Sequence, residues 1–169
     1  MRAISMATLL VLGLLAACSK PSAPPQSTTA PEAATPSPPP TPTLTDAQKK
    51  ALLAELPAAY QSADLDNGQA KFAICKTCHN TARGAGDMTG PNLYGIFGRK
   101  AGGEPGFAYS DGMKSLGITW DAASIDKWIT NPRAMNPATK MTYIGMQNPK
   151  DRIDLVAYLK TVTSPPPAS

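Results

Sequence analysis

Apolar residues recur at helical spacing in four parts of the chain: 45–56, 66–76, 119–130 and the stretch that begins at Asn148. The last stretch has the clearest start, because Asn148 is a favourable N-cap and Pro149 suits the first helical position. One face of this stretch repeats apolar residues every three positions: Ile153, Val156, Leu159 and Val162. We therefore expect that face to be buried.

The helix predicted at 45–56 lies ahead of the other three. Thr45 and Gln48 match a capping box, three leucines share one face, and Pro57 ends the segment. The pattern leaves open whether this helix docks on the rest of the protein or floats beside it.

Between the second and third helices, residues 83–118 are rich in glycine and have no sustained periodicity. A loop of this length is unusual in a compact domain unless another component supplies the core. We predict an all-α domain in which the helix at 66–76 crosses the last helix. Gly68 would allow the two to approach closely near Tyr158.

The N-terminus has the features of a bacterial export signal. Arg2 precedes a short apolar run, 7–17, which is too short to span a membrane. The run closes as Leu-Ala-Ala followed by Cys18, which resembles a lipobox whose cysteine is acylated and becomes the mature N-terminus. The alternative is an ordinary signal peptide with Cys18 incidental. Because an exported unpaired thiol needs an explanation, we expect a lipid anchor at Cys18 on the periplasmic side of a membrane.

Nine prolines occur within residues 21–42, together with Ser, Thr and Ala. This composition builds no core and favours an extended tether of up to roughly 70 Å. The predicted organisation is a signal peptide at 1–17, a lipid-anchored tether at 18–44, a short helical linker at 45–63, a folded domain at 64–163 and a Pro-rich tail at 164–169. The folded part has no basic cluster with interleaved aromatic residues, so we expect no nucleic-acid partner.

Cys75, Cys78 and His79 form Cys-x-x-Cys-His, the motif for covalent attachment of haem c. In this interpretation the two thiols form thioethers with the porphyrin, and His79 binds the iron. A structural zinc site needs about four Cys or His ligands, but the chain has one histidine and its third cysteine is Cys18. A thioredoxin-like site belongs in a βαβ pattern, which this region lacks. We therefore predict one covalent haem c.

A single histidine excludes bis-histidine ligation within the chain, so methionine is the obvious second ligand. Five methionines follow the signal segment: Met88, Met113, Met135, Met141 and Met146. Of these, Met141 ends a loop that Pro132 and Pro137 stiffen.

Four segments resemble class I cytochromes c of the mitochondrial and bacterial c2 type: GPNLYGIFGRKAG at 90–102, PGFAYSD at 105–111, GITW at 117–120 and NPRAMNPATKM at 131–141. The resemblance covers about 64–162 and implies the class I cytochrome c fold, with helices wrapped around one covalently attached haem. It also implies that His79 and Met141 are the axial ligands. The carbonyl of Pro91 would then accept a hydrogen bond from His79 and fix its orientation.

The resemblance further assigns four side chains to the haem propionates: Arg99, Tyr109, Trp120 and Thr139. For the two aromatic residues, ordinary core packing is the alternative. Three positions depart from the family pattern and affect the tuning of the potential: Trp128 stands where a Tyr hydroxyl usually reaches the methionine sulfur, Met113 where Asn is common, and Ala138 where Gly is usual.

Lysines that surround the haem edge in the mitochondrial proteins are mostly replaced in this chain. The replacing residues are Ile74, Met88, Gln147 and Asn148. Arg133 and Lys140 keep a positive charge there, so partner capture is expected to depend less on charge steering.

These features predict an electron carrier and not an enzyme. We expect a monomeric, membrane-tethered periplasmic cytochrome whose partners are redox proteins such as a quinol–cytochrome c reductase and a terminal oxidase or reductase. The alternative is a haem c peroxidase or gas sensor in which Met141 leaves the iron. That chemistry needs a distal base, and the chain has no second histidine.

Overall fold

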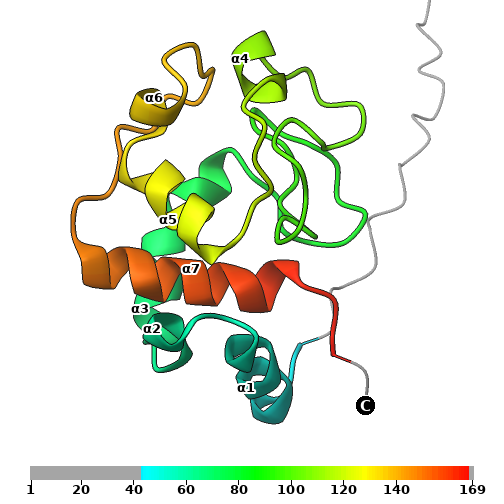
Figure 1. Cartoon of the computed structure of the whole chain (residues 1–169). Helices are drawn as coiled ribbons and strands as arrows, with labels where there is room; N and C mark the ends of the chain where they lie inside the picture. Colours follow the sequence, from blue (N-terminus) through cyan, green and yellow to red (C-terminus); the bar gives the residue numbers. More distant parts are fainter. Residues whose placement is uncertain (1–42, 168–169) are drawn as a thin grey trace, which may run out of the picture. The chain divides into compact units, whose positions relative to one another are not determined.

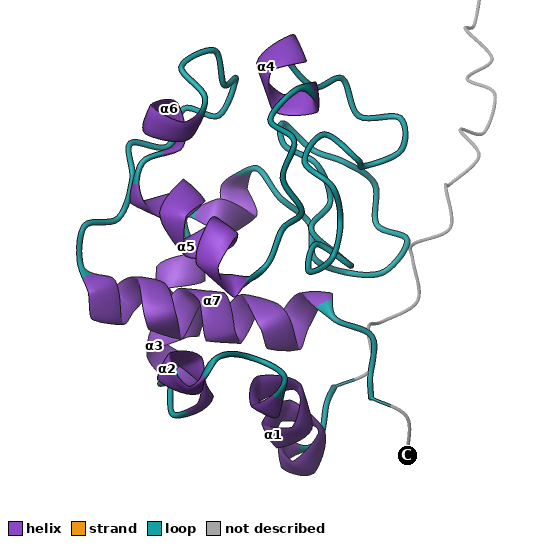
Figure 2. Cartoon of the chain, viewed as in Figure 1, coloured by secondary structure: helices purple, strands orange, loops and turns teal. Residues whose placement is uncertain are grey.

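The computed structural model describes residues 43–167, so the predicted signal segment, Cys18 and nearly all of the predicted tether lie outside the described residues. Within that range the regular structure comprises α1 (Asp46–Ala54), α2 (Ala58–Gln61), α3 (Leu65–Phe72), the 3-10 turn η1 (Cys75–Thr77), α4 (Asp111–Lys114), α5 (Ala122–Thr130), α6 (Pro132–Met135) and α7 (Pro149–Thr163). Figure 2 shows these helices joined by loops, with no strand in the described part of the chain. The predicted all-α fold is confirmed.

α7 is the central helix of the domain, and α1, α2, α3 and α5 all pack against it (Figure 1). The N-terminus of α7 is as predicted. The side chain of Asn148 accepts hydrogen bonds from the backbone N–H groups of Lys150 and Asp151, and Pro149 is the first residue of the helix. Val156 is fully buried and Leu159 nearly so. None of the helices at 43–167 is long and apolar enough to cross a membrane.

α3 crosses α7 at Gly68, as the sequence predicted. A Cβ atom placed on Gly68 would overlap the carbonyl oxygen of Asp154 and lie 2.6 Å from Cβ of Tyr158. Phe72, one turn further along α3, is buried and packs against the Tyr158 ring at 5.7 Å between centroids. The crossing therefore depends on the missing side chain of glycine.

A buried carboxylate joins the two helices beside this crossing. Asp154 is only 2% exposed, and it accepts hydrogen bonds from the backbone N–H of Asp64 at 3.0 Å, from Asn67 at 2.7 Å and from Lys150 at 2.6 Å. Burial raises the pKa of Asp154, but the hydrogen bonds from Lys150 and Asn67 outweigh it, so the pKa is lowered overall. The network keeps the carboxylate charged and ties the start of α3 to α7.

We expect Gly68→Ala to lower the free energy of unfolding by about 1–3 kcal/mol, the usual cost of overpacking a tight contact. Alanine gains about 1 kcal/mol of helix propensity, but the overlap with a backbone oxygen outweighs that gain. The matched control is Gly86→Ala, because no atom lies within 4 Å of a Cβ at that position. Chemical denaturation of the haem-loaded proteins measures both, and equal midpoints for the two variants would contradict the close packing.

The helix predicted at 45–56 docks on the domain. α1 begins after Thr45, whose capping box with Gln48 is formed, and α1 and α2 both contact α7. Four apolar side chains from α1, α2 and the residues between them are buried in the core: Leu52, Leu53, Leu56 and Tyr60. Glu55 pairs with Lys160 at 2.7 Å, which further ties α1 to α7.

The remaining helices differ from the predicted ones at their ends. The segment predicted as 66–76 is α3, which ends at Phe72, followed by the separate turn η1 that carries the cysteines. The helix predicted at 119–130 begins at Ala122, since Asp121 is its N-cap in a capping box with Ser124. The single-turn helices α2, α4 and α6 are too short to show periodicity.

Candidate functional site

A cavity of about 570 Å³ lies among α3, η1, α5, α7 and the loops between them. Apolar side chains make up most of its wall: Phe72, Leu93, Ile96, Trp120, Ile125, Trp128, Ile129, Leu155 and Leu159. Cys75, Cys78, His79 and Met141 line the same cavity. The structure thus brings together residues that lie up to 66 positions apart in the sequence.

The turn η1 holds the two cysteines. The backbone N–H groups of Cys78 and His79 both donate to the carbonyl of Cys75, at 3.1 and 3.0 Å, which closes the motif into a tight turn. Neither cysteine is in a disulfide. Burial raises the pKa of Cys75 to about 11, so this thiol is protonated at neutral pH.

The ring of His79 has a defined tautomer. Its Nδ1 lies 2.7 Å from the carbonyl oxygen of Pro91, and because a carbonyl can only accept, Nδ1 carries the proton. A Cβ on Gly90 would overlap the ring, so the glycine lets the loop lie flat against it. Burial lowers the pKa of His79, which favours the neutral imidazole. Nε2 is therefore left with a free lone pair.

Met141 is held from two sides. Its backbone N–H donates to Oγ1 of Thr139 at 3.1 Å, and its Sδ accepts a hydrogen bond from Nε1 of Trp128 at 3.3 Å. The Trp128 ring is itself fixed by an edge-on contact with Trp120, at 5.6 Å between centroids. The indole N–H of Trp128 thus reaches the sulfur.

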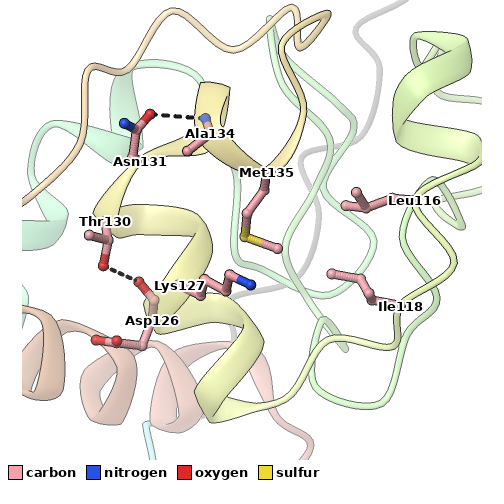
Figure 3. Close-up of a pocket in the computed structure, with 8 residues that line it drawn as sticks. All are labelled: Leu116, Ile118, Asp126, Lys127, Thr130, Asn131, Ala134 and Met135. Carbon is pink, nitrogen blue, oxygen red and sulfur yellow. Dashed lines mark hydrogen bonds between the residues drawn. The ribbon is translucent and has the colours of Figure 1, made fainter.

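Of the other methionines, Met135 lies away from this cavity and Met113 lies in its wall. Met135 lies in a second cleft of about 540 Å³, formed by α5, α6 and the loop at 116–118 (Figure 3). Figure 3 also shows that this cleft is bordered by the charged side chains of Asp126 and Lys127. Met113 is the one further methionine that lines the cavity with the cysteines.

Three of the four side chains assigned to propionates line the cavity: Tyr109, Trp120 and Thr139. Among the described residues, neither the Tyr109 hydroxyl nor the Trp120 indole N–H has a hydrogen-bond partner. Arg99 does not line the cavity. Its guanidinium pairs with Glu104 and donates to the carbonyl of Asn92 at 2.8 Å. Its role toward a propionate stays a prediction.

These residues fit a covalently bound haem. The apolar wall suits a porphyrin, the two thiols suit its vinyl groups, and a lone pair on His79 together with a thioether on Met141 suits an iron of intermediate softness. Tyr109 and Trp120 line the same cavity and carry hydrogen-bond donors, which suit the propionates.

The comparisons with known proteins agree with this site. The family model for cytochrome c matches residues 65–163. Cytochrome c2 of Rhodomicrobium vannielii is 45% identical over 104 residues, covering 62% of this chain and 83% of the relative. Cytochrome c2 of Rhodoplanes tepidamans is 47% identical over 96 residues, covering 57% of this chain and 90% of the relative.

Among solved structures, cytochrome cH from Methylobacterium extorquens is similar, with a TM-score of 0.55 and 43% sequence identity. The alignment covers 59% of this chain and 99% of that one. The predicted class I fold, the predicted single covalent haem c, and the prediction of an electron carrier and not an enzyme are confirmed, and Cys75 and Cys78 fit the attachment motif. The chain belongs to the cytochrome c family.

Proposed function

We propose that this chain carries single electrons between periplasmic redox proteins while His79 and Met141 occupy both axial positions of its haem iron. The observation that carries the proposal is the hydrogen bond from Trp128 to the Met141 sulfur, in the cavity that also holds the cysteines and His79. A sulfur held in place in this way is suited to a weak Fe–S(thioether) bond, because the protein has already ordered it.

The contacts of each residue suggest its role in holding and tuning the haem. When bound, haem c supplies a one-electron Fe(III)/Fe(II) couple. Cys75 and Cys78 would hold the group and His79 would present Nε2 to the iron, while the carbonyl of Pro91 keeps the proton on Nδ1. Methionine favours the reduced iron and raises the potential. The apolar side chains of the cavity exclude water, and this also favours the less charged, reduced iron.

The proposed partners are a quinol–cytochrome c reductase as donor and a terminal oxidase or reductase as acceptor. A carrier tethered to a membrane would meet such membrane proteins at a high effective concentration. The single histidine leaves no distal base for peroxide chemistry, so this proposal is preferred to a peroxidase.

A redox titration of the purified protein tests the proposed ligation. We expect one one-electron transition at a positive potential, without any change in ligation between the two oxidation states. Two transitions, or a transition that shifts when imidazole is added at millimolar concentration, would show that an axial position is open.

The proposed role of Trp128 predicts a smaller effect. Trp128→Phe keeps an aromatic ring at this position but removes the N–H donor to Met141, and a hydrogen bond of this kind is worth about 1 kcal/mol, or about 40 mV for a one-electron couple. The sulfur becomes a better donor to the oxidised iron, so the midpoint potential should fall by about that amount. Tyr158→Phe serves as the aromatic control, because Tyr158 does not line the cavity, and an unchanged potential in Trp128→Phe would remove the indole from this role.

The anchor predicted at Cys18 is tested through the mature N-terminus. We expect mass spectrometry to find a diacylated or triacylated cysteine as the first residue of the mature protein. In Cys18→Ser, processing should stall or move to another site, whereas an ordinary cleavable signal should release a protein with an unchanged spectrum and potential. An unmodified terminus elsewhere than Cys18 would leave a plain periplasmic cytochrome.

A further inference from the structure

The segment that follows Met141 is fastened to the end of α5. The backbone N–H of Met146 donates to the carbonyl of Ile129 at 2.8 Å. Gly145 has φ of +112°, and a Cβ there would overlap the carbonyl oxygen of Thr130, so the backbone lies directly against the end of α5. The chain is therefore held shortly after Met141, before it enters α7.

Arg152, near the start of α7, closes this junction. Its Nε donates to Oδ1 of Asp126 on α5 at 2.9 Å, and its Nη1 donates to the carbonyls of Met146 at 3.1 Å and Gln147 at 2.9 Å. Among residues 43–167, no other donor reaches either of these carbonyls. One guanidinium group thus joins α5, α7 and the segment between Met141 and α7.

The geometry of these contacts suits an arginine. The guanidinium group is planar and presents five N–H donors in fixed directions, so one side chain can bond a carboxylate and two carbonyls at once. The Arg152 side chain is only 13% exposed, so its pair with Asp126 is screened less than an ion pair on the open surface. A lysine would keep the charge but places its three donors on one nitrogen, which suits fewer of these separate acceptors.

The helix that Arg152 grips also holds the Met141 sulfur. Trp128 on α5 donates its indole N–H to Sδ of Met141, and Asp126 lies two residues earlier on the same helix. Arg152 therefore fixes the segment after Met141 to the helix from which Trp128 reaches the sulfur. Two attachments to one helix restrict the movement of the residues between them.

We propose that Arg152 is a positioning residue for Met141. It keeps the sulfur at the haem iron by holding the following segment on α5. Arg152 does not line the cavity, so it acts through the chain and not on the haem itself. The inference rests on the proposed function, in which Met141 is an axial ligand. When the contacts of Arg152 are lost, Met141 should leave the iron more often while the rest of the domain stays folded.

Imidazole binding to the oxidised, haem-loaded protein measures how often Met141 leaves the iron. Imidazole binds only the open form, so its apparent affinity is the intrinsic affinity multiplied by the fraction of open protein. We expect Arg152→Gln to raise the apparent affinity by about tenfold or more, because hydrogen bonds from a charged group are lost. Arg152→Lys should fall between this variant and the parent, and it provides the test if Arg152→Gln does not fold. Visible absorption follows both titrations.

Two control variants separate positioning from general stability and from charge. Gly68→Ala disturbs α7 at its crossing with α3, and Arg83→Gln removes the same charge from an exposed loop position. Both should bind imidazole within about twofold of the parent. An Arg152→Gln variant that binds imidazole like the parent would overturn the proposal, and so would a Gly68→Ala variant that gains as much affinity as Arg152→Gln.

Met141→Ala distinguishes failure of this inference from failure of the proposed ligation. If Met141→Ala binds imidazole no better than the parent, Met141 is not the ligand and the proposed function fails. If Met141→Ala binds it tightly but Arg152→Gln binds it like the parent, only the role of Arg152 fails. In the Met141→Ala background, Arg152→Gln should change the affinity by less than about twofold, because no sulfur remains to be positioned. A change of about tenfold in that background would overturn the inference.

Discussion

Replacing Met141 by alanine should open the iron and lower the midpoint potential by on the order of 100 mV or more, within the range of about 0.8 V that axial ligands set. The variant should also bind carbon monoxide and turn over peroxide, which the parent does not. The physical reason is the loss of a soft thioether ligand that favours reduced iron.

The matched control is Met135→Ala, because this methionine lies in the second cleft and not in the cavity with the cysteines (Figure 3). Its potential and its response to carbon monoxide should equal those of the parent. If Met141→Ala kept the parental potential while Met113→Ala lost it, the second ligand would be the other methionine that lines the cavity.

Replacing both Cys75 and Cys78 by alanine should yield a protein that does not fold under conditions in which the parent is stable. The cavity wall consists mainly of apolar side chains, which lose their packing partner and face water when no haem is attached. The stability of a typical domain is only about 5–15 kcal/mol, so the loss of so large a part of the core should unfold the protein. Far-ultraviolet circular dichroism measures the expected loss of helix.

Thr77→Ala is the control for this experiment, because Thr77 lies between the two cysteines and its hydroxyl donates only to the carbonyl of Ile74 and to a cysteine sulfur. It should retain covalent haem and a parental melting temperature. A double cysteine variant that is compact, helical and still carries covalently held haem would be incompatible with attachment at these thiols.

Local chemistry in the sequence was enough to predict much of the fold. The helix starts at Thr45 and Asn148 could be predicted, because a capping side chain forms hydrogen bonds with backbone N–H groups within three residues of it. The crossing at Gly68 could be predicted as well. Glycine lowers the stability of a helix, so a glycine inside a helix indicates a place where another element packs closely against it. The conformation of residues 83–118 could not be predicted, because they have no sustained periodicity and pack around a core that other residues also form.

Long-range contacts could not be predicted from the sequence. The docking of α1 depends on leucines meeting α7 across about 100 residues, and the pattern of one helix does not name its partner. The bond from Trp128 to Met141 depends on how two segments meet in space. The pairing of Arg99 with Glu104 lies in a loop without regular structure, where spacing does not predict a partner, and the resemblance pointed toward the propionates instead.

The central claim is that both axial positions of the iron are filled, by His79 and Met141, and that the protein transfers electrons without binding a ligand at the metal. Titration of the reduced, full-length protein with carbon monoxide at neutral pH tests this most directly. The account predicts that the visible spectrum of the parent does not change, whereas that of Met141→Ala does. A parent that binds carbon monoxide readily would contradict the closed site and favour a peroxidase or gas sensor.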